Sequence, residues 1–375
     1  NLITLYHLIF IVKIKNNMSI CIIGNNLSAL TLAKALVKQN IFVDVLYDKK
    51  NSHISKTRTI GISKNNTDYL NKNILNIDKL LWKLKKIEIF SDNLKKEKLI
   101  NFENNSNELF SIIRNQNLSD LLGRSLSKSK YFKKVNGLKS LNFLNNYNLV
   151  INTDFNHQIT KKYFSKKINK EYNSVAYTTT IRHQKIHNDI AVQIFTKMGP
   201  LAFLPVSERE TSIVYSLNNF KNNSHKSVGG LIEQYNYKYK IQKVEKINYF
   251  ELKSLSLRSY YHDNILAFGD LLHRIHPLAG QGFNMTLRDI KIFLDIIVNK
   301  VSLGLAIDSS ANYEFEKKIR HKNLIFSNGI DLVHEFFNFE RKINSTFLSK
   351  SVQILGKNSS VNKFFTSMAD KGTLI

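Results

Sequence analysis

The 375-residue sequence is poor in cysteine, tryptophan, proline and glycine, and it is short of acidic residues. It contains one Cys, one Trp, three Pro and fourteen Gly. The single Cys21 excludes an intramolecular disulfide and any metal site built from several cysteines. It lies in an apolar run, which favours a small core residue. Because Pro and Gly are rare, a short segment that concentrates them is informative.

Acidic residues are outnumbered, with 29 Asp and Glu against 55 Lys and Arg, and the formal net charge is +26. Lysines are spread along the chain among many Asn and Ile, so compositional drift explains them as well as a binding surface does. No nucleic-acid-binding motif accompanies them, and we expect no nucleic-acid partner. The window 121–170 is the most basic, with eleven Lys or Arg and one acid. Its charge would suit an anionic membrane surface.

The N-terminal segment carries no clear targeting signal. Residues 2–14 are apolar but too short to span a bilayer, and they lack a small-residue cleavage site. Because Met18 directly precedes a strand pattern, we expect residues 1–17 to be a ragged or non-native extension. The sequence predicts a cytoplasmic protein, either soluble or peripheral on the inner face of the membrane.

Residues 19–48 show the strand, turn, helix and strand of a dinucleotide-binding unit. Free N–H groups at the start of the helix would bind a pyrophosphate, and the acid that ends the second strand would bind a ribose. Only the first glycine of the usual motif is present, so an ordinary strand–helix turn is an equal alternative. The candidate nucleotide contacts are Gly24, Asn26, Ser28, Ala29 and Asp48.

The most specific segment is 264–300. An apolar strand leads to Gly269 and Asp270, a loop with Pro277 follows, and Gly280-Gln281-Gly282 opens a long amphipathic helix. The Asp270 carboxylate can accept hydrogen bonds from the hydroxyls of a ribityl chain, and the glycines keep side chains away from the edge of a flat ring. The positive end of the helix would stabilise a reduced, negatively charged flavin.

The segment His-Pro-Leu-Ala-Gly-Gln-Gly-Phe-Asn at 276–284 resembles the second FAD motif of flavoprotein aromatic hydroxylases of the para-hydroxybenzoate hydroxylase type. Its detail is closest to the ubiquinone-biosynthesis hydroxylases. Segments 57–63, 113–118 and 180–205 resemble the same family in the same order, so the resemblance covers nearly the whole chain from Met18. It adds to the candidate FAD contacts Arg58, Asn115, Pro277, Gln281, Gly282 and Asn284.

Three positions depart from the family pattern. Asn26 replaces the second glycine of the first motif, and we expect its side chain to crowd the phosphate. The family's Asp-Gly motif, which contacts both flavin and nicotinamide nucleotides, appears as Asp154 followed by Phe155, and Arg114 stands where an acid is usual. Adequate FAD binding, weakened NAD(P)H use and a decaying protein all fit these changes. The intact C-terminal motif favours the first.

The resemblance implies an α/β fold, in which a Rossmann-like FAD domain is interleaved with a β-rich substrate domain and C-terminal helices follow. The FAD domain would comprise 18–70, 91–171 and 256–310, and the substrate domain 71–90 and 172–255. The C-terminal portion, 311–375, would hold helices at 313–326 and 331–339. We interpret Trp82, in a helix-like Leu-rich run, as a core residue first and as part of the substrate-pocket wall second.

The resemblance also implies the chemistry. NAD(P)H would reduce FAD, O₂ would form a flavin C4a-hydroperoxide, and the aromatic ring of a polyprenylated phenol would be hydroxylated in ubiquinone biosynthesis. No side chain is nominated as catalytic, and the chain's histidines predict no metal site. Alternatives are a degenerate flavoprotein that serves as a scaffold in a ubiquinone-biosynthesis complex, and another FAD oxidoreductase of the same fold. One tryptophan excludes the Trp-x-Trp-x-Ile motif of halogenases.

Overall fold

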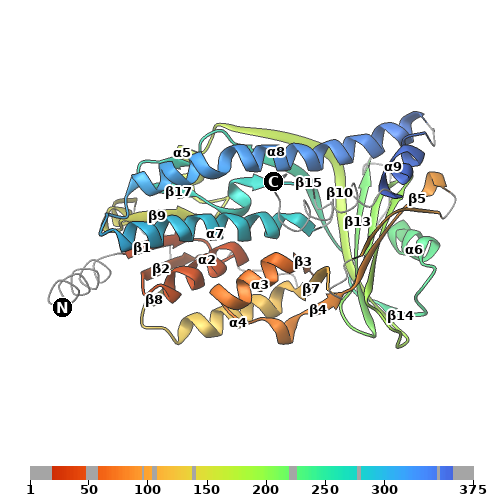
Figure 1. The fold of residues 1–375 in the computed structure, drawn as a ribbon, viewed down its shortest axis with the longest axis horizontal. Coiled ribbons are helices and arrows are strands. Elements are labelled where there is room, and N and C mark those ends of the chain that lie inside the picture. Colours follow the sequence, from red (N-terminus) through yellow and green to blue (C-terminus); the bar gives the residue numbers. More distant parts are fainter. Residues whose placement is uncertain are drawn as a thin grey trace.

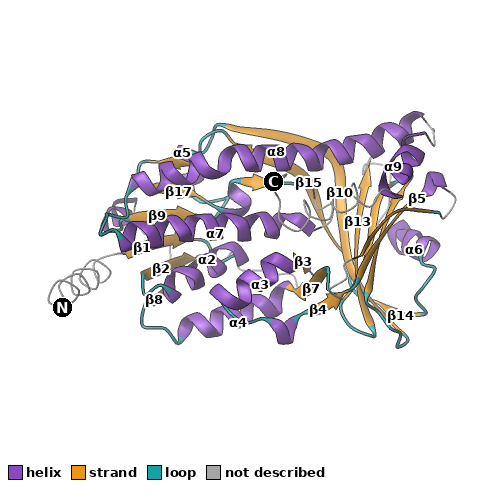
Figure 2. Cartoon of the chain, in the orientation of Figure 1, coloured by secondary structure: helices purple, strands orange, loops and turns teal. Residues whose placement is uncertain are grey.

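The computed structural model describes residues 19–47, 58–94, 97–103, 108–136, 141–218, 226–276, 280–343 and 347–357. Figures 1 and 2 show helices gathered around one sheet, with a second, strongly twisted sheet standing beside them. A long C-terminal helix runs along both parts. Helices and strands are thus mixed along the chain, and the α/β fold class predicted from the sequence is confirmed.

The first sheet has six strands in the described residues, in the order β16-β17-β9-β1-β2-β8. All pairs except β16 with β17 are parallel. Parallel strands present their carboxyl ends at one edge, so the loops that follow β1, β9 and β17 meet there. The bounds are β1 Ser19–Ile23, β2 Phe42–Tyr47, β8 Phe132–Asn136, β9 Leu149–Asn152, β16 Tyr261–His262 and β17 Ile265–Ala267.

Apolar residues fill the space between this sheet and its helices. Cys21 on β1 is fully buried, and burial raises the pKa of its thiol to about 12 with a smaller contribution from Asp44. Phe293 packs with its ring centroid 6.0 Å from that of Phe268 and 5.3 Å from that of Phe315. The helices are α2 Leu27–Lys38, α4 Asn115–Ser127, α7 Gln281–Ser302 and α8 Ser309–Ile343.

The second sheet is mostly antiparallel, in the order β18-β15-β10-β13-β12-β11-β5-β6 with β14 paired to β10 among the described strands. Its core holds the fully buried rings of Tyr177, Phe203 and Tyr215. The bounds are β5 Lys86–Ser91, β6 Lys98–Glu103, β10 Lys167–His183, β11 Ile190–Thr196, β12 Gly199–Pro205, β13 Glu210–Asn218, β14 Ile241–Val244, β15 Asn248–Leu257 and β18 His273–Arg274.

A small antiparallel sheet, β3-β7-β4, lies between the two larger ones. Its strands are β3 Thr59–Ser63, β4 Trp82–Leu84 and β7 Phe110–Arg114. The helix-like interpretation of the Trp82 run is therefore wrong. Apolar Trp82 and Leu84 alternate with lysines, and a two-residue period favours a strand. The Trp82 indole N–H donates to the carbonyl of Asn188 at 2.6 Å.

Two expected boundaries differ from the strands. β6 pairs with β5 in the nine-stranded sheet, although we expected residues 91–171 in the FAD domain. Strand β10 runs unbroken across the expected boundary at residue 171. The division into domains stays a prediction.

The C-terminal region also differs from expectation. The helices expected at 313–326 and 331–339 form the single helix α8, which continues through Gly329. A Gly inside a helix costs only about 1 kcal/mol relative to Ala, which the packing of this helix offsets. The remaining helical segments are α3 Lys64–Asn73, α5 Gln158–Tyr163, α6 Lys226–Tyr235, α9 Phe347–Lys357, and the 3-10 turns η2 Asp78–Leu80, η3 Asp92–Leu94, η4 Leu141–Asn146 and η6 Gly269–Leu271.

Replacing Phe293 with Ala should destabilise the fold by about 3–5 kcal/mol, because the ring is fully buried and its removal leaves a cavity. The free energy of unfolding from urea titration measures this. Phe339→Ala is the control, since that ring is 57% exposed and should lose less than about 1 kcal/mol. Equal losses for the two variants would contradict the described core.

Candidate functional site

Three helices begin next to one another, around the carboxyl edge of the six-stranded sheet and strand β3. Helix α2 follows β1 directly. Helix α7 begins beside β3, because a Cβ on Gly280 would lie 3.6 Å from the backbone N of Gly61. Helix α4 begins at the start of β3, where the Asn115 N–H donates to the Arg58 carbonyl at 3.0 Å. Helix N-termini favour anions and acceptor groups, so this arrangement suits a polar ligand.

The turn between β1 and α2 requires glycine at its first position. Gly24 has φ +118°, and a Cβ there would lie 2.3 Å from Oγ1 of Thr153. The Asn26 side chain caps α2, accepting from the Ala29 N–H at 2.9 Å and donating to the Thr153 carbonyl at 3.0 Å. It lies across the helix N-terminus, so a phosphate there would have to accept from the remaining amides.

The segment after β17 places an acid beside this turn. Gly269 has φ +65°, and a Cβ there would lie 2.7 Å from Cβ of Ser28, so Gly269 lets the segment approach α2 closely. Ser28 is buried, which makes it a packing residue at this contact. Asp270 is exposed, and its carboxylate makes no hydrogen bond or ion pair with any residue that the structure describes. It can therefore accept hydrogen bonds from a hydroxyl-bearing ligand.

The start of α7 is fixed against β3 by Asn284, which is fully buried. Its Oδ1 accepts from the Ser63 N–H at 3.0 Å and from Nδ2 of Asn66 at 2.9 Å. Its Nδ2 donates to the carbonyls of Gly61 at 3.0 Å and Gly280 at 3.2 Å. These four bonds use the capacity of the amide. Asn284 therefore positions the site rather than offering a free group to a ligand.

Gly280 and Gly282 play different roles at the same helix N-terminus. Gly280 adopts φ +63°, a left-handed conformation that favours glycine. A Cβ on Gly282 would meet nothing within 4 Å among the described residues, so this side of the helix start is open. A flat ring could approach the backbone here without a clash.

Each of the three helix N-termini carries a buried amide oxygen that has no hydrogen-bond partner among the described residues. These atoms are Oδ1 of Asn25, Oδ1 of Asn115 and Oε1 of Gln281. A buried polar atom without a partner costs about 1–3 kcal/mol, which a ligand with N–H or O–H donors would recover. FAD carries such donors in its ring, ribityl chain and adenine, so the residues present fit this group. Sequence reasoning had missed Asn25, although it lies inside the turn of the first motif.

The structure describes only some of the remaining predicted contacts. Arg58 is exposed beside Asn115, at the start of β3. Asp48 and Pro277 lie outside the described residues. The structure places Gly24, Asn26, Ser28, Ala29, Asp154, Gly269 and Asp270 at the carboxyl edge of the six-stranded sheet. It places Arg58, Asn115, Gly280, Gln281, Gly282 and Asn284 beside β3.

The segment at the position of the family's Asp-Gly motif is held by hydrogen bonds among its own residues. Oδ1 of Asp154 accepts from the Asn156 N–H at 2.8 Å, and the Asp154 carbonyl accepts from Oγ1 of Thr160 at 2.7 Å. Nδ1 of His157 accepts from the Ile159 N–H at 3.3 Å and caps α5. One oxygen of the Asp154 carboxylate is therefore engaged locally.

The histidines that the structure describes do not gather into a metal site. Among the described residues, no three His, Cys, Asp or Glu side chains are grouped to hold a metal ion. Nε2 of His273 lies 2.6 Å from Oδ2 of Asp289, and both side chains are buried. The His276 ring packs against the rings of Tyr172 and His334, with centroids 5.0 Å and 4.5 Å away. These contacts make His273 and His276 structural residues of the segment that leads to α7.

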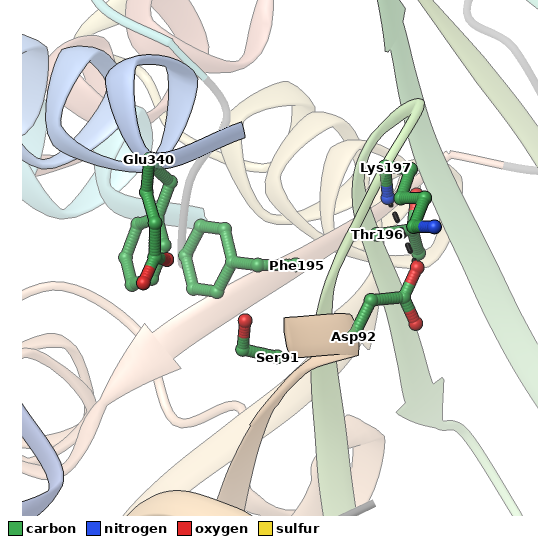
Figure 3. Close-up of a pocket in the computed structure, with 7 residues that line it drawn as sticks. Ser91, Asp92, Phe195, Thr196, Lys197 and Glu340 are labelled. Carbon is green, nitrogen blue, oxygen red and sulfur yellow. Dashed lines mark hydrogen bonds between the residues drawn. The ribbon is translucent and has the colours of Figure 1, made fainter. Parts of the chain in front are cut away.

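A small hollow lies elsewhere, between the ends of β5 and β11 and helix α8 (Figure 3). Buried Glu340 faces it and accepts from the N–H and Oγ of Ser349, each at 2.6 Å. These hydrogen bonds join α8 to α9, so we assign the hollow to the contact between these two helices rather than to a binding site. It is lined by Ser91, Asp92, Phe195, Thr196, Lys197, Phe337 and Glu340, none of which belongs to the candidate site.

Comparison with known proteins identifies relatives by sequence, although no protein-family model matches. The chain is 29% identical over 161 residues to the 3-demethoxyubiquinol 3-hydroxylase of Escherichia coli, covering 40% of each chain. It is 26% identical over 168 residues to the ubiquinone hydroxylase UbiL of Rhodospirillum rubrum, covering 41% of this chain and 38% of that one. The chain thus spans about 40% of the length of these relatives. The predicted resemblance to ubiquinone hydroxylases is confirmed.

Longer matches extend the comparison to nearly the whole chain. The chain is 23% identical over 407 aligned positions to the ubiquinone biosynthesis monooxygenase COQ6 of Dictyostelium discoideum, covering 84% of this chain and 81% of that one. The p-nitrophenol 4-monooxygenase PnpA of Pseudomonas putida has a similar structure, with a TM-score of 0.77 at 12% identity, covering 94% of this chain and 99% of that one. HpxO of Klebsiella pneumoniae, solved with FAD and uric acid, has a TM-score of 0.70 at 12% identity and coverages of 95% and 97%. These structures show a shared fold.

Replacing Asp270 with Ala should weaken FAD binding by about 1.5–3 kcal/mol, because it removes a charged acceptor. Titration of the purified protein with FAD, followed by flavin fluorescence, measures the change. Asp295→Ala is the control, since Asp295 is also exposed and lies about four turns into α7, away from its N-terminus. Unchanged affinity in Asp270→Ala would show that this carboxylate does not contact the cofactor.

His157 should make the fold less stable in acid. Burial lowers the pKa of its imidazole, while Asp154 acts in the opposite direction. In the unfolded chain the pKa returns to about 6.5. As the pH falls through that value, the unfolded state takes up the proton first, and the free energy of unfolding decreases.

Replacing His157 with Asn keeps a capping acceptor and removes the titrating group. The difference in unfolding free energy between about pH 7.5 and about pH 5.5 should therefore shrink. Urea titrations at the two pH values measure it, with exposed His262→Asn as the control. The same pH dependence in wild type and His157→Asn would assign the effect to other groups.

Proposed function

We propose that the chain is an FAD-dependent monooxygenase that hydroxylates the aromatic ring of a polyprenylated phenol in ubiquinone biosynthesis. The observation that carries this proposal is the set of amide oxygens of Asn25, Asn115 and Gln281, at three helix N-termini, that find no partner in the described part of the chain. The names of the sequence relatives support the substrate class. The fold shared with HpxO, which was solved with FAD, supports the cofactor, and the fold shared with the p-nitrophenol 4-monooxygenase PnpA supports the reaction class.

Bound FAD would supply the reduction of O₂ and the transfer of one oxygen atom to the ring, with NAD(P)H as the source of electrons. The chain's own residues would hold the cofactor. The N-terminus of α2 would bind the pyrophosphate, and Asp270 would accept from the ribityl hydroxyls. Gln281 and Asn115 would accept from donors on the ring or sugar, while Gly280 and Gly282 leave room for the ring edge. No side chain is assigned as a catalytic acid or base.

An apolar substrate would reach the site from a bilayer or from a partner in a biosynthetic complex. The basic window 121–170 offers less support for lipid contact than the sequence suggested. Its lysines at 128–134 lie around β8, at one edge of the six-stranded sheet. Those at 161–162 lie on α5, whose Tyr163 packs 4.4 Å from His262 of β16 at the opposite edge. Two separated groups attract anionic lipid less than one continuous face.

Peripheral placement on the inner face of the membrane stays part of the proposal. No helix of the described residues combines the length and the apolar character needed to cross a bilayer. The polyprenyl tail of the proposed substrate is uncharged and the protein chain is basic. Both properties favour transient contact of the chain with the bilayer surface over insertion into the bilayer.

A non-catalytic scaffold is the second candidate. The closed turn at Asp154 favours it, because this segment replaces the motif that contacts nicotinamide nucleotides in the resembling family. A scaffold would keep the fold and the partner surfaces but lose reduction by NAD(P)H.

Purified protein should show flavin absorption bands, and anaerobic addition of NADPH should bleach them because the reduced ring no longer absorbs at those wavelengths. Stopped-flow absorbance measures the rate, and dithionite provides the reduction control. Bands that dithionite bleaches and NADPH does not, with a phenolic ligand present, would favour the scaffold or another reductant. Protein that binds no flavin would refute the proposed function.

A further inference from the structure

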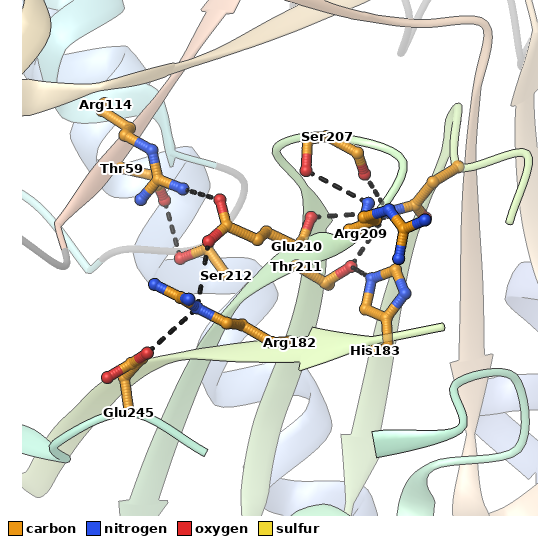
Figure 4. Close-up of polar contacts among 11 residues, drawn as sticks. Thr59, Arg114, Arg182, His183, Ser207, Arg209, Glu210, Thr211, Ser212 and Glu245 are labelled. Carbon is orange, nitrogen blue, oxygen red and sulfur yellow. Dashed lines mark hydrogen bonds and ion pairs between the residues drawn. The ribbon is translucent and has the colours of Figure 1, made fainter. Parts of the chain in front are cut away.

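Strand β3 is the place where the cofactor side of the molecule meets the nine-stranded sheet. Thr59 on β3 and Arg114 on β7 are cross-strand partners in the small sheet. They face Glu210 and Ser212, which lie two residues apart on β13 and so share one side of that strand. Oγ1 of Thr59 donates to Oγ of Ser212 at 2.8 Å, and Nη2 of Arg114 donates to Oε2 of Glu210 (Figure 4).

The carboxylate of Glu210 is shared between two arginines. Its Oε2 pairs with Arg114, and its Oε1 lies 3.4 Å from Nε of Arg182 on β10. Nε of Arg182 also lies 3.1 Å from Oε1 of Glu245 (Figure 4). The network of ion pairs therefore extends from Arg114 through Glu210 and Arg182 to Glu245. The Arg114 and Glu210 side chains are each only 25% exposed. A partly desolvated pair of this kind is less screened than a surface pair.

The position of Arg114 makes this contact more than an incidental surface pair. Arg114 is the N-cap of α4, where a positive charge opposes the positive end of the helix dipole. A negative partner offsets that repulsion, and Glu210 on the other sheet supplies it. The next residue, Asn115, carries one of the unpartnered amide oxygens. The start of α4 therefore depends on a charge that the other sheet provides.

The same contact reaches the start of α7 through β3. Thr59 lies two residues before Gly61, whose carbonyl accepts from Nδ2 of Asn284. Asn284 in turn holds Gly280 through the Gly280 carbonyl. Arg58 precedes Thr59, and its carbonyl accepts from the Asn115 N–H. A shift of β13 relative to β3 would thus move groups at two of the three helix N-termini.

We propose that Arg114 and Glu210, with Thr59 and Ser212, form a latch between the two sheets that positions the start of α4 and the strand β3 for cofactor binding. Arg114 and Glu210 are positioning residues, because they act through Asn115, Arg58 and Gly61. The latch rests on the proposed function only for the identity of the cofactor. Its mechanical part, the dependence of β3 on Glu210, stands on the contacts alone.

The test is a double-mutant cycle in the full chain, with Arg114→Gln, Glu210→Gln and the double variant. Glu208→Gln is the matched control, because Glu208 lies in the turn before β13 and pairs at 3.0 Å with Lys185 in the loop after β10. Hydrogen exchange of the β3 amides and of the first turn of α4 is measured without FAD. The dissociation constant of FAD is measured by fluorescence titration.

Each single variant should raise exchange at β3 and α4, and weaken FAD binding, by roughly fivefold relative to Glu208→Gln. The double variant should match Glu210→Gln, because Arg114 has already lost its partner in that variant, whereas in Arg114→Gln the Glu210 carboxylate keeps Arg182. Exchange at α9, far along the chain from the latch, should stay unchanged and so separates a local effect from general destabilisation.

Additive effects of the two substitutions, or an equal effect of Glu208→Gln, would overturn the latch. Raised exchange at β3 with unchanged FAD affinity would overturn its role in positioning the cofactor site. Wild-type protein that binds no FAD would refute the proposed function, while the exchange cycle would still support or refute the mechanical part of the latch.

Discussion

The close approach of helix α7 to strand β3 is the constraint on which the rest of the site depends. One buried amide, that of Asn284, makes four hydrogen bonds that join the start of α7 to β3 and α3. Gly280 adopts φ +63° next to the Gly61 backbone, while a Cβ on Gly61 would lie 2.1 Å from the Phe110 ring, so glycine is required on both sides of this contact. A helix N-terminus is useful to a ligand only when its amides are held at a fixed position. The predicted ring site therefore depends on a residue whose side chain faces the protein.

Much of this arrangement was predictable because the local signals are strong. The strand, turn and helix at 19–38 and the helix from Gln281 appear where the apolar pattern and the glycines indicate them. The sequence motif around Gly280 also correctly predicted a similarity to ubiquinone hydroxylases. The prediction for Trp82 failed because a three-residue strand has too few alternating positions to outweigh neighbouring leucines. The break expected between residues 326 and 331 contains Asn328-Gly329, a turn signal that tertiary packing overrides in helix α8.

Long-range partners were outside the reach of sequence reasoning. Nothing local to Arg114 indicates that Glu210, 96 residues later, supplies its counter-charge. The same holds for Asn284, which the sequence predicts as a ligand contact and which the structure shows bonded to the chain itself. A motif records that a residue type is needed at a position, and it does not distinguish contact with the ligand from support of the backbone that makes the contact. Asn25 illustrates the reverse case, since its unpartnered oxygen becomes apparent only with burial.

The buried thiol of Cys21 makes the chain an almost ideal host for site-directed labels. The side chain lies at the centre of β1 with no exposed surface, and burial keeps the thiolate scarce by raising its pKa to about 12. Maleimides and thiol-reactive spin labels react with exposed thiolates, so Cys21 of the native chain would not react with them. Two cysteines placed on β7 and β13 could then carry a pair of spin labels, which report short separations, without any background substitution. The distance between the two sheets would become directly measurable in solution.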